Sequence, residues 1–185
     1  IGGSSNRIAD CYLVFNSSVA TVSVTGGSVL EGKTVCAWGS ASSGIDLGST
    51  FVVTGGAFTV GTASTTIIYG LPYTPKYQSA KLAYAAQRGT ALTQPKRVNH
   101  LGLILSNTHA RGLRFGPSTD YLDQLPVTEG MQKISTDTVT GSYDEESIEF
   151  SGTWDTDSRV VLLGQAPRPC TVLGMVVQME TKEKV

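Results

Sequence analysis

The side chains that could carry out catalysis are few in this chain and stand far apart. A hydrolase triad needs a nucleophile, a base within hydrogen-bond reach and an orienting carboxylate. Only two histidines occur, His100 and His109, and no serine lies in a GxSxG sequence. Because neither histidine belongs to a catalytic motif, we expect His100 in a strand and His109 in a turn, each as a structural or surface residue.

Two acidic clusters have residue types that could bind a metal or cleave a glycosidic bond. They are Asp144-Glu145-Glu146 and Asp155-Thr156-Asp157. Paired carboxylates catalyse glycoside hydrolysis at a suitable separation, and carboxylate oxygens are the ligands that calcium prefers. The spacing matches no EF-hand loop, and both clusters suit the polar tips of hairpins. We therefore expect neither a calcium site nor an acid–base pair at these positions.

The cysteines and glycines give no sign of a cofactor. Cys11, Cys36 and Cys170 are too far apart for a CxxC pattern, so we expect three free thiols made in a reducing cytosol. The pairs Gly26-Gly27 and Gly55-Gly56 fit tight turns between strands, and no phosphate-binding loop precedes a helix. The sequence thus predicts a protein that is not an enzyme and that carries no cofactor or metal.

The elements that position these residues alternate apolar and polar side chains with period two, as strands do. The chain has 185 residues, and its Thr- and Val-rich runs are punctuated by 21 glycines. This pattern predicts an all-β protein, with a small β-barrel or sandwich module in residues 1–72. An antiparallel β-sandwich follows in residues 73–185 and begins with an extended linker segment, 73–95. One or two helical turns at Lys81–Arg88 are the alternative within that linker.

The same alternation selects the core of the second unit. The expected core-facing sets are Leu101, Leu103 and Leu105 in one strand, and Ile148, Phe150 and Trp154 in another. Because Trp154 shares a face with two apolar neighbours, we expect it, like Trp38, to pack inside the protein.

The charges are unevenly distributed although they nearly cancel. The formal net charge is −1, which excludes a generally basic nucleic-acid binder. Residues 76–115 carry seven basic and no acidic side chains, whereas residues 116–185 carry five basic and twelve acidic ones. The two stretches either pair within one folded chain or face different neighbours in an assembly. For an assembly, the candidate subunit-interface charges are Lys96, Arg97, Arg111, Arg114, Asp144, Glu145 and Glu146.

Five motifs, in order over about residues 11–182, resemble a module of phage tail proteins. They are VLEGKTV (29–35), VTGG (53–56), YGLPYT (69–74), PKRVNHL (95–101) with NTHARG (107–112), and PCTVLGM (169–175). The corresponding family segments read LEGKTV, V(T/S)GG, VGLPYT, KRI followed by a T-x-G turn, and PCTVLAL. The chain departs from the family at Asn99-His100, where the family tends to have a basic residue. No lumen-facing charge is therefore carried over to that position.

The chain thus resembles the tail nozzle of short-tailed bacteriophages, also called tail tubular protein B. The resemblance implies a structural virion protein, assembled in the bacterial cytoplasm, whose six copies form a ring around the channel for double-stranded DNA. The head-to-tail adaptor protein and the tail fibres or spikes would be its neighbours. Because the nozzle is several times longer and the chain does not begin with Met, we expect the C-terminal portion of a longer polypeptide.

Other functions are compatible with the same fold class. One is a glycan-binding β-sandwich module of a tail fibre or spike, in which Trp38 and Trp154 would be exposed platforms for sugar rings. Another is a hydrolase of the host envelope that depends on His100. Apolar runs such as Val172–Val177 are far shorter than a membrane span, so we expect no membrane insertion by this segment.

Overall fold

The protein is built almost entirely of β-strands. The computed structural model describes residues 9–39, 44–83, 85–86, 89–90, 92–129, 132–133 and 139–182. Strands make up 65% of the described residues, and the one helical element among them is a short 3-10 turn, η1 (Ser28–Leu30). The all-β prediction is therefore confirmed. The paired strands are antiparallel, and no sheet in the described ranges closes into a barrel.

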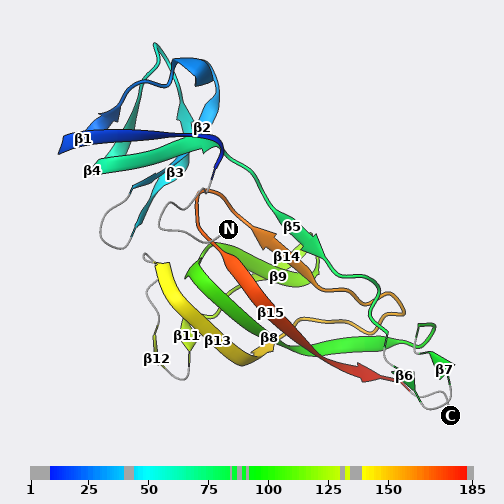
Figure 1. Cartoon of the computed structure of the whole chain (residues 1–185). Helices are drawn as coiled ribbons and strands as arrows, with labels where there is room; N and C mark the ends of the chain where they lie inside the picture. The colour runs from blue at the N-terminus through cyan, green and yellow to red at the C-terminus, as the bar shows by residue number, and fades with distance from the viewer. Residues whose placement is uncertain are drawn as a thin grey trace.

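Residues 10–71 form an open four-stranded sheet in the order β1-β4-β2-β3 (Figure 1). The strands are β1 (Asp10–Val24), β2 (Thr34–Gly39), β3 (Ile45–Val52) and β4 (Phe58–Leu71). Their alternating side chains bury one face, whose centre is an aromatic group: the Phe58 ring lies 5.4 Å from that of Phe51 and 5.1 Å from that of Tyr69. Each large apolar side chain buried there contributes about 1.5–3 kcal/mol.

The rest of the chain forms two sheets that pack face to face. One has the order β13-β8-β15 and the other β10-β9-β14-β5. The first comprises β8 (Lys96–His109), β13 (Val139–Glu149) and β15 (Thr171–Thr181); the second comprises β5 (Lys76–Gln78), β9 (Leu113–Ser118), β10 (Tyr121–Gln124) and β14 (Val161–Gly164). Two small hairpins are β6 (Ala85–Ala86) with β7 (Gly89–Thr90), and β11 (Thr128–Glu129) with β12 (Gln132–Lys133). This part is an antiparallel sandwich.

The sandwich core follows the sequence pattern in β8 and departs from it after β13. Leu101, Leu103 and Leu105 are at most 1% exposed and pack against β9 and β14, as expected. Ile148 and Phe150 are also buried, but Trp154 is 41% exposed. The expectation that Trp154 shares their face was wrong, because β13 ends at Glu149 and the strand alternation does not continue through residues 150–154.

The structure tests the expected helical turns in the linker but not the expected division into two units. Residues 81–83 are not helical and Ala85–Ala86 is a strand, while Tyr84, Gln87 and Arg88 lie outside the described residues. The helical alternative is therefore absent from the part of Lys81–Arg88 that is described. The division at residue 72 into two independently folding units stays a prediction.

Specific contacts join the N-terminal sheet to the sandwich. The carboxylate of Asp46 on β3 forms a salt bridge of 2.8 Å with the guanidinium Nε of Arg168. The Trp38 ring meets the buried His109 ring edge to face, with centroids 5.8 Å apart. Beside them Cys36 packs with Ala9 and Ala166 in a small apolar cluster. These contacts bury Trp38, which is 2% exposed.

The cysteines are free thiols in three environments: Cys11 is exposed, Cys170 is half-buried and Cys36 is buried. Burial raises the pKa of Cys36 to about 11; its own backbone hydrogen bond opposes this rise, and the charge of Asp46 adds to it. Burial likewise raises the pKa of Cys170, against the hydrogen bond from Thr108. A thiol held protonated in the folded state is an unreactive one, because the thiolate is the nucleophile.

The raised pKa of Cys36 predicts that the protein loses stability at alkaline pH. Its folded pKa lies above its unfolded value near 9, so the unfolded state loses the proton first. The protonated Cys36 thiol therefore adds about 3 kcal/mol to the free energy of unfolding below pH 9, and this stabilisation is lost as the pH rises to about 11. Urea unfolding between pH 8 and pH 11 should therefore show a smaller decline for Cys36→Ala than for the wild type. Equal declines would contradict the assignment, and Cys11→Ser is the matched control.

Candidate subunit-contact surfaces

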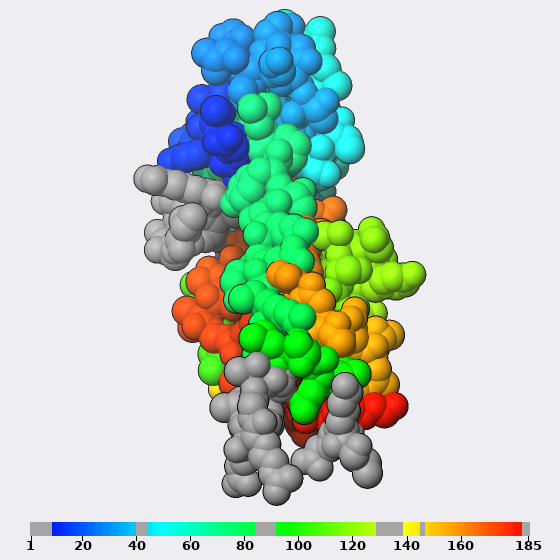
Figure 2. All heavy atoms as spheres, turned by 90° about the vertical axis from the view of Figure 1, so that its right-hand side faces the viewer, coloured from blue at the N-terminus to red at the C-terminus, as the bar shows by residue number. Residues whose placement is uncertain are grey.

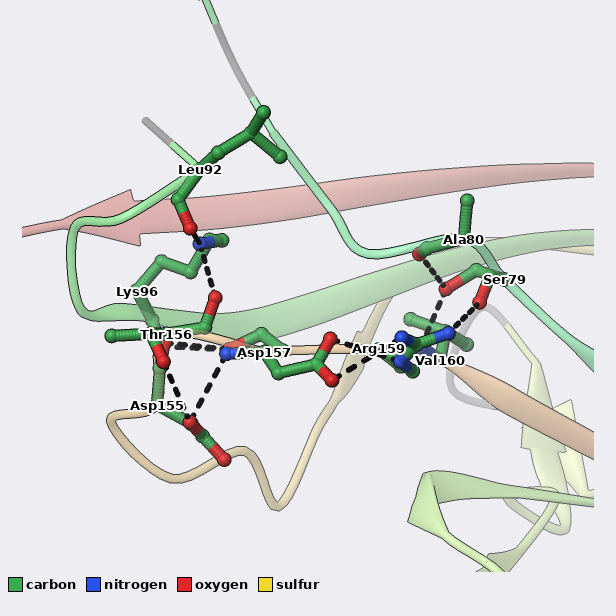
Figure 3. Close-up of polar contacts among 10 residues, drawn as sticks. Ser79, Ala80, Leu92, Lys96, Asp155, Thr156, Asp157, Arg159 and Val160 are labelled. Carbon is green, nitrogen blue, oxygen red and sulfur yellow. Dashed lines mark hydrogen bonds and ion pairs between the residues drawn. The ribbon is translucent and has the colours of Figure 1, made fainter. Parts of the chain in front are cut away.

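Lys96, the first of the candidate interface charges, does not lie on the surface. It is 0% exposed. Its ammonium Nζ donates to the backbone carbonyl oxygens of Thr156 at 2.7 Å and Leu92 at 3.5 Å (Figure 3). A third acceptor is the Gln94 carbonyl at 3.1 Å. Desolvation and the nearby Lys81 lower its pKa, while Asp157 and Asp155 oppose the shift. Lys96 is therefore corrected from a subunit contact to an internal tie between the start of β8 and the loop after β13.

Backbone contacts strengthen that tie. Lys96 and Asp155 exchange two main-chain hydrogen bonds of 2.8 and 3.0 Å, and the Ser158 hydroxyl donates to the Lys96 carbonyl at 2.8 Å. In the same loop the Arg159 guanidinium forms a salt bridge with Asp157 and donates to the Ser79 carbonyl (Figure 3). The loop and the segment after β5 are thereby fixed to the sandwich.

Arg97 and Arg111 are exposed, as a contact surface requires. Arg97 points away from the core on β8 and donates to the Asn99 side-chain oxygen at 3.0 Å. Arg111 stands in the turn between β8 and β9, where its backbone nitrogen donates to the His109 ring at 3.1 Å. Neither takes part in the two salt bridges found in the described residues, which are Arg159–Asp157 and Arg168–Asp46.

Arg114 has an internal role instead. It is half-buried on β9, and its Nη2 donates to the Leu122 carbonyl of β10 at 2.9 Å. Its Nε is buried and has no hydrogen-bond partner among the described residues. Because this side chain holds β10 onto β9, we assign it to the fold ahead of any contact between copies.

Of the acidic candidates, Asp144 is exposed on β13, opposite Ile104 of β8. Glu145 and Glu146 belong to the same strand, but their side chains lie outside the described residues. The seven candidates therefore do not form one surface: two are internal, two are exposed cations on or after β8, and three are on β13.

The sheet orders define two unlike flanks of the sandwich. β15 and β5 are edge strands that line one cavity together, so they share a side. The opposite edges, β13 and β10, share the other side, where the Ser151 hydroxyl just after β13 donates to the Asp123 carboxylate of β10 at 2.9 Å. We call this second side the acidic flank; its exposed acidic residues are Asp120, Asp123, Asp144 and Glu149.

The β5–β15 side, here called the grooved flank, has a mostly apolar cavity of about 580 Å³ between the two sheets. Figure 2 looks onto this flank, with the segment after Leu71 running down the middle and the orange-red residues of β15 beside it. Leu113, Leu162 and Met175 line the cavity, together with the exposed rim residues Tyr77 and Leu173. Among the described residues that line the cavity, Lys76 is the one Lys, Arg, Asp or Glu.

A second, more polar depression of about 420 Å³ lies beside the Asp155–Arg159 loop. Tyr121, which is 73% exposed, stands on its rim. Most of its charged groups already bind one another: Arg159 donates to both oxygens of Asp157, and the Asp157 backbone donates to Asp155. Sequence reasoning found neither cavity.

Two of the five sequence motifs form one structural unit. The Glu31 carboxylate accepts hydrogen bonds from the backbone nitrogens of Gly55 at 2.9 Å and Gly56 at 2.7 Å. Both glycines have φ between 61° and 72°, a conformation that side chains with a Cβ rarely adopt. The VLEGKTV and VTGG motifs are therefore two halves of one turn arrangement, and their residues serve the fold.

The described residues contain no group of three or more His, Cys, Asp or Glu side chains arranged to hold a metal ion. No helix in the described ranges is long and apolar enough to cross a membrane. The chain matches no protein-family model, and no curated protein matches it significantly. The fold and surfaces thus define an all-β protein with one acidic and one apolar, grooved flank.

Proposed function

We propose that this protein is a structural component of a bacteriophage tail and forms part of the nozzle through which DNA is ejected into the host. The five motifs in register support this proposal. The observation that carries it is that Lys76, Arg97 and Arg111 are exposed and form no salt bridge within the described residues, although an acidic stretch follows them. Such charges are available to a neighbouring copy.

In this proposal identical copies close a hexameric ring beneath the adaptor protein, with the fibres or spikes attached around it. A ring places one patch of each copy against a different patch of the next, and opposite charges on those patches set the register. Exposed ion pairs contribute only about 0–1 kcal/mol each, so apolar contact must supply most of the affinity. Double-stranded DNA then passes through transiently, since a chain of net charge −1 has no basic excess to bind it tightly.

Sedimentation velocity of the 185-residue chain tests the proposal. We expect a reversible equilibrium between a monomer and one larger species of fixed size, populated at micromolar concentration and low salt. A chain that stays monomeric up to the highest soluble concentration would contradict the proposal. A continuous series of increasing sizes would indicate an open filament and contradict a closed ring.

The glycan-binding alternative is favoured by one observation, the 41% exposure of Trp154. Against it, Trp38 is buried, and the Lys182 ammonium lies 5.6 Å from the centre of the Trp154 ring, over one of its two faces. Binding of the chain to a glycan array, lost in Trp154→Ala and kept in Trp38→Phe, would establish this alternative.

A further inference from the structure

We infer that two copies of this chain dock through their unlike flanks, with the acidic flank of one copy covering the apolar groove of the next. The inference rests on the proposed assembly and names the surfaces that make it. Its starting point is that the sandwich has two open sides of different chemistry, described above, and that each is a pair of edge strands.

The groove has the features of a surface that is covered in the functional state. Its rim exposes large apolar side chains: Leu173 is 66% exposed, Tyr77 is 52% and Val172 is 40%. Below them lie Leu113 and Leu162 of the core. Apolar surface costs about 25 cal/mol for each Å² left in water, and contiguous exposed patches of this kind mark contact sites.

The acidic flank offers a fitting counterpart. Tyr121 begins β10 and is 73% exposed; in the sequence it follows Asp120 directly and precedes Asp123 by two residues. Tyrosine is enriched among the residues that anchor interfaces by filling a pocket on the partner. The charges also match at the groove, because Lys76 stands in the cavity wall and the one acidic residue of β15, Glu180, lies beyond the cavity near the end of that strand.

The size of the flanks is sufficient for a specific contact. β15 has 11 residues, so the flank is about 37 Å long at about 3.4 Å per residue. With two sheets about 10 Å apart and side chains on both outer faces, its depth is about 20 Å. The resulting area is roughly 700 Å², close to the roughly 800 Å² per partner that specific interfaces bury.

Because the two flanks differ, the contact is heterologous, and this gives a test that a symmetric dimer would fail. One variant disables the groove, Leu173→Glu. The other disables the acidic flank, Tyr121→Ser with Asp120→Lys. Each should be monomeric alone at concentrations where the wild type assembles. A 1:1 mixture should form a dimer and stop there, since one intact groove meets one intact acidic flank.

Val19→Glu is the matched control, because Val19 is 71% exposed on β1 of the N-terminal sheet and lies outside both flanks. It should assemble like the wild type. Circular dichroism and thermal unfolding must show that all variants fold. If the wild type assembles and the folded groove and flank variants assemble equally well, the docking inference is overturned and the proposed function stands. If the wild type itself never assembles, both fall.

Discussion

Replacing Lys96 by alanine is expected to lower the free energy of unfolding by about 4 kcal/mol. The side chain is fully buried, so the change removes apolar stem packing worth about 2 kcal/mol. It also removes the donor for the Thr156, Gln94 and Leu92 carbonyls. Leaving such acceptors unsatisfied costs about 1–3 kcal/mol each, and the relief of burying an ammonium offsets part of this.

The two contributions can be separated with a second substitution. Lys96→Met keeps most of the stem and removes only the donor, so we expect it to restore about half of the lost stability. Arg97→Met is the matched control at the next, exposed position and should change the stability by less than about 0.5 kcal/mol. Denaturant unfolding measures all three. A wild-type-like Lys96→Ala would show that the carbonyls are satisfied by water and that the tie is unimportant.

Alternation predicted the strands correctly where a strand is long and one face is buried. Leu101, Leu103 and Leu105 are such a case. Extended back from Leu101, the same rule places Asn99 on the inner face, but the structure buries Val98 and Lys96 instead. The reason is a register shift in the pairing of β8 with β15 between His100 and Val98, which the sequence pattern does not reveal. Sequence reasoning grouped Lys96 with Arg97 as surface charges because a charge usually lies in water. The burial of Lys96 is possible because its ammonium donates to the nearby Leu92 and Gln94 carbonyls and to that of Thr156, 60 residues away.

The sequence placed Trp154 wrongly and did not predict the groove, for two different reasons. The alternation of β13 extends on paper through residue 154, but the strand ends at Glu149, and a sequence does not reveal that stop. The groove is lined by residues from 75 to 175, contributed by edge and interior strands of two separate sheets. Since no local pattern records which strands become edges, such a cavity is visible only in three dimensions.

Reversing the charge of Lys76 or Arg111 is expected to weaken assembly about fivefold to tenfold at low salt. Lys76 lines the groove, and Arg111 lies two residues before Leu113 of the groove wall. Each would lose up to about 1 kcal/mol of attraction to the acidic flank and add a repulsion. At about 1 M salt the Debye length falls to about 3 Å, so the wild type should weaken and its difference from the variants should nearly vanish.

Lys33→Glu is the control for these reversals, because Lys33 is exposed directly before β2 of the N-terminal sheet and lies outside the sandwich flanks. Sedimentation velocity at low and high salt compares the three variants with the wild type. Arg114→Glu should behave differently again: it should lower the melting temperature, because it breaks the bond to the Leu122 carbonyl. Equal assembly by the wild type and by the Lys76, Arg111 and Lys33 variants at both salt concentrations would show that the charge separation has no role between copies.

The central claim is that copies of this chain close into a ring around a channel. Negative-stain electron microscopy of the purified assembly at low salt tests it most directly. We expect class averages of closed rings with a stain-filled central hole, wide enough for a DNA duplex and with one fixed number of subunits. Compact particles without a hole, or open filaments, would contradict it.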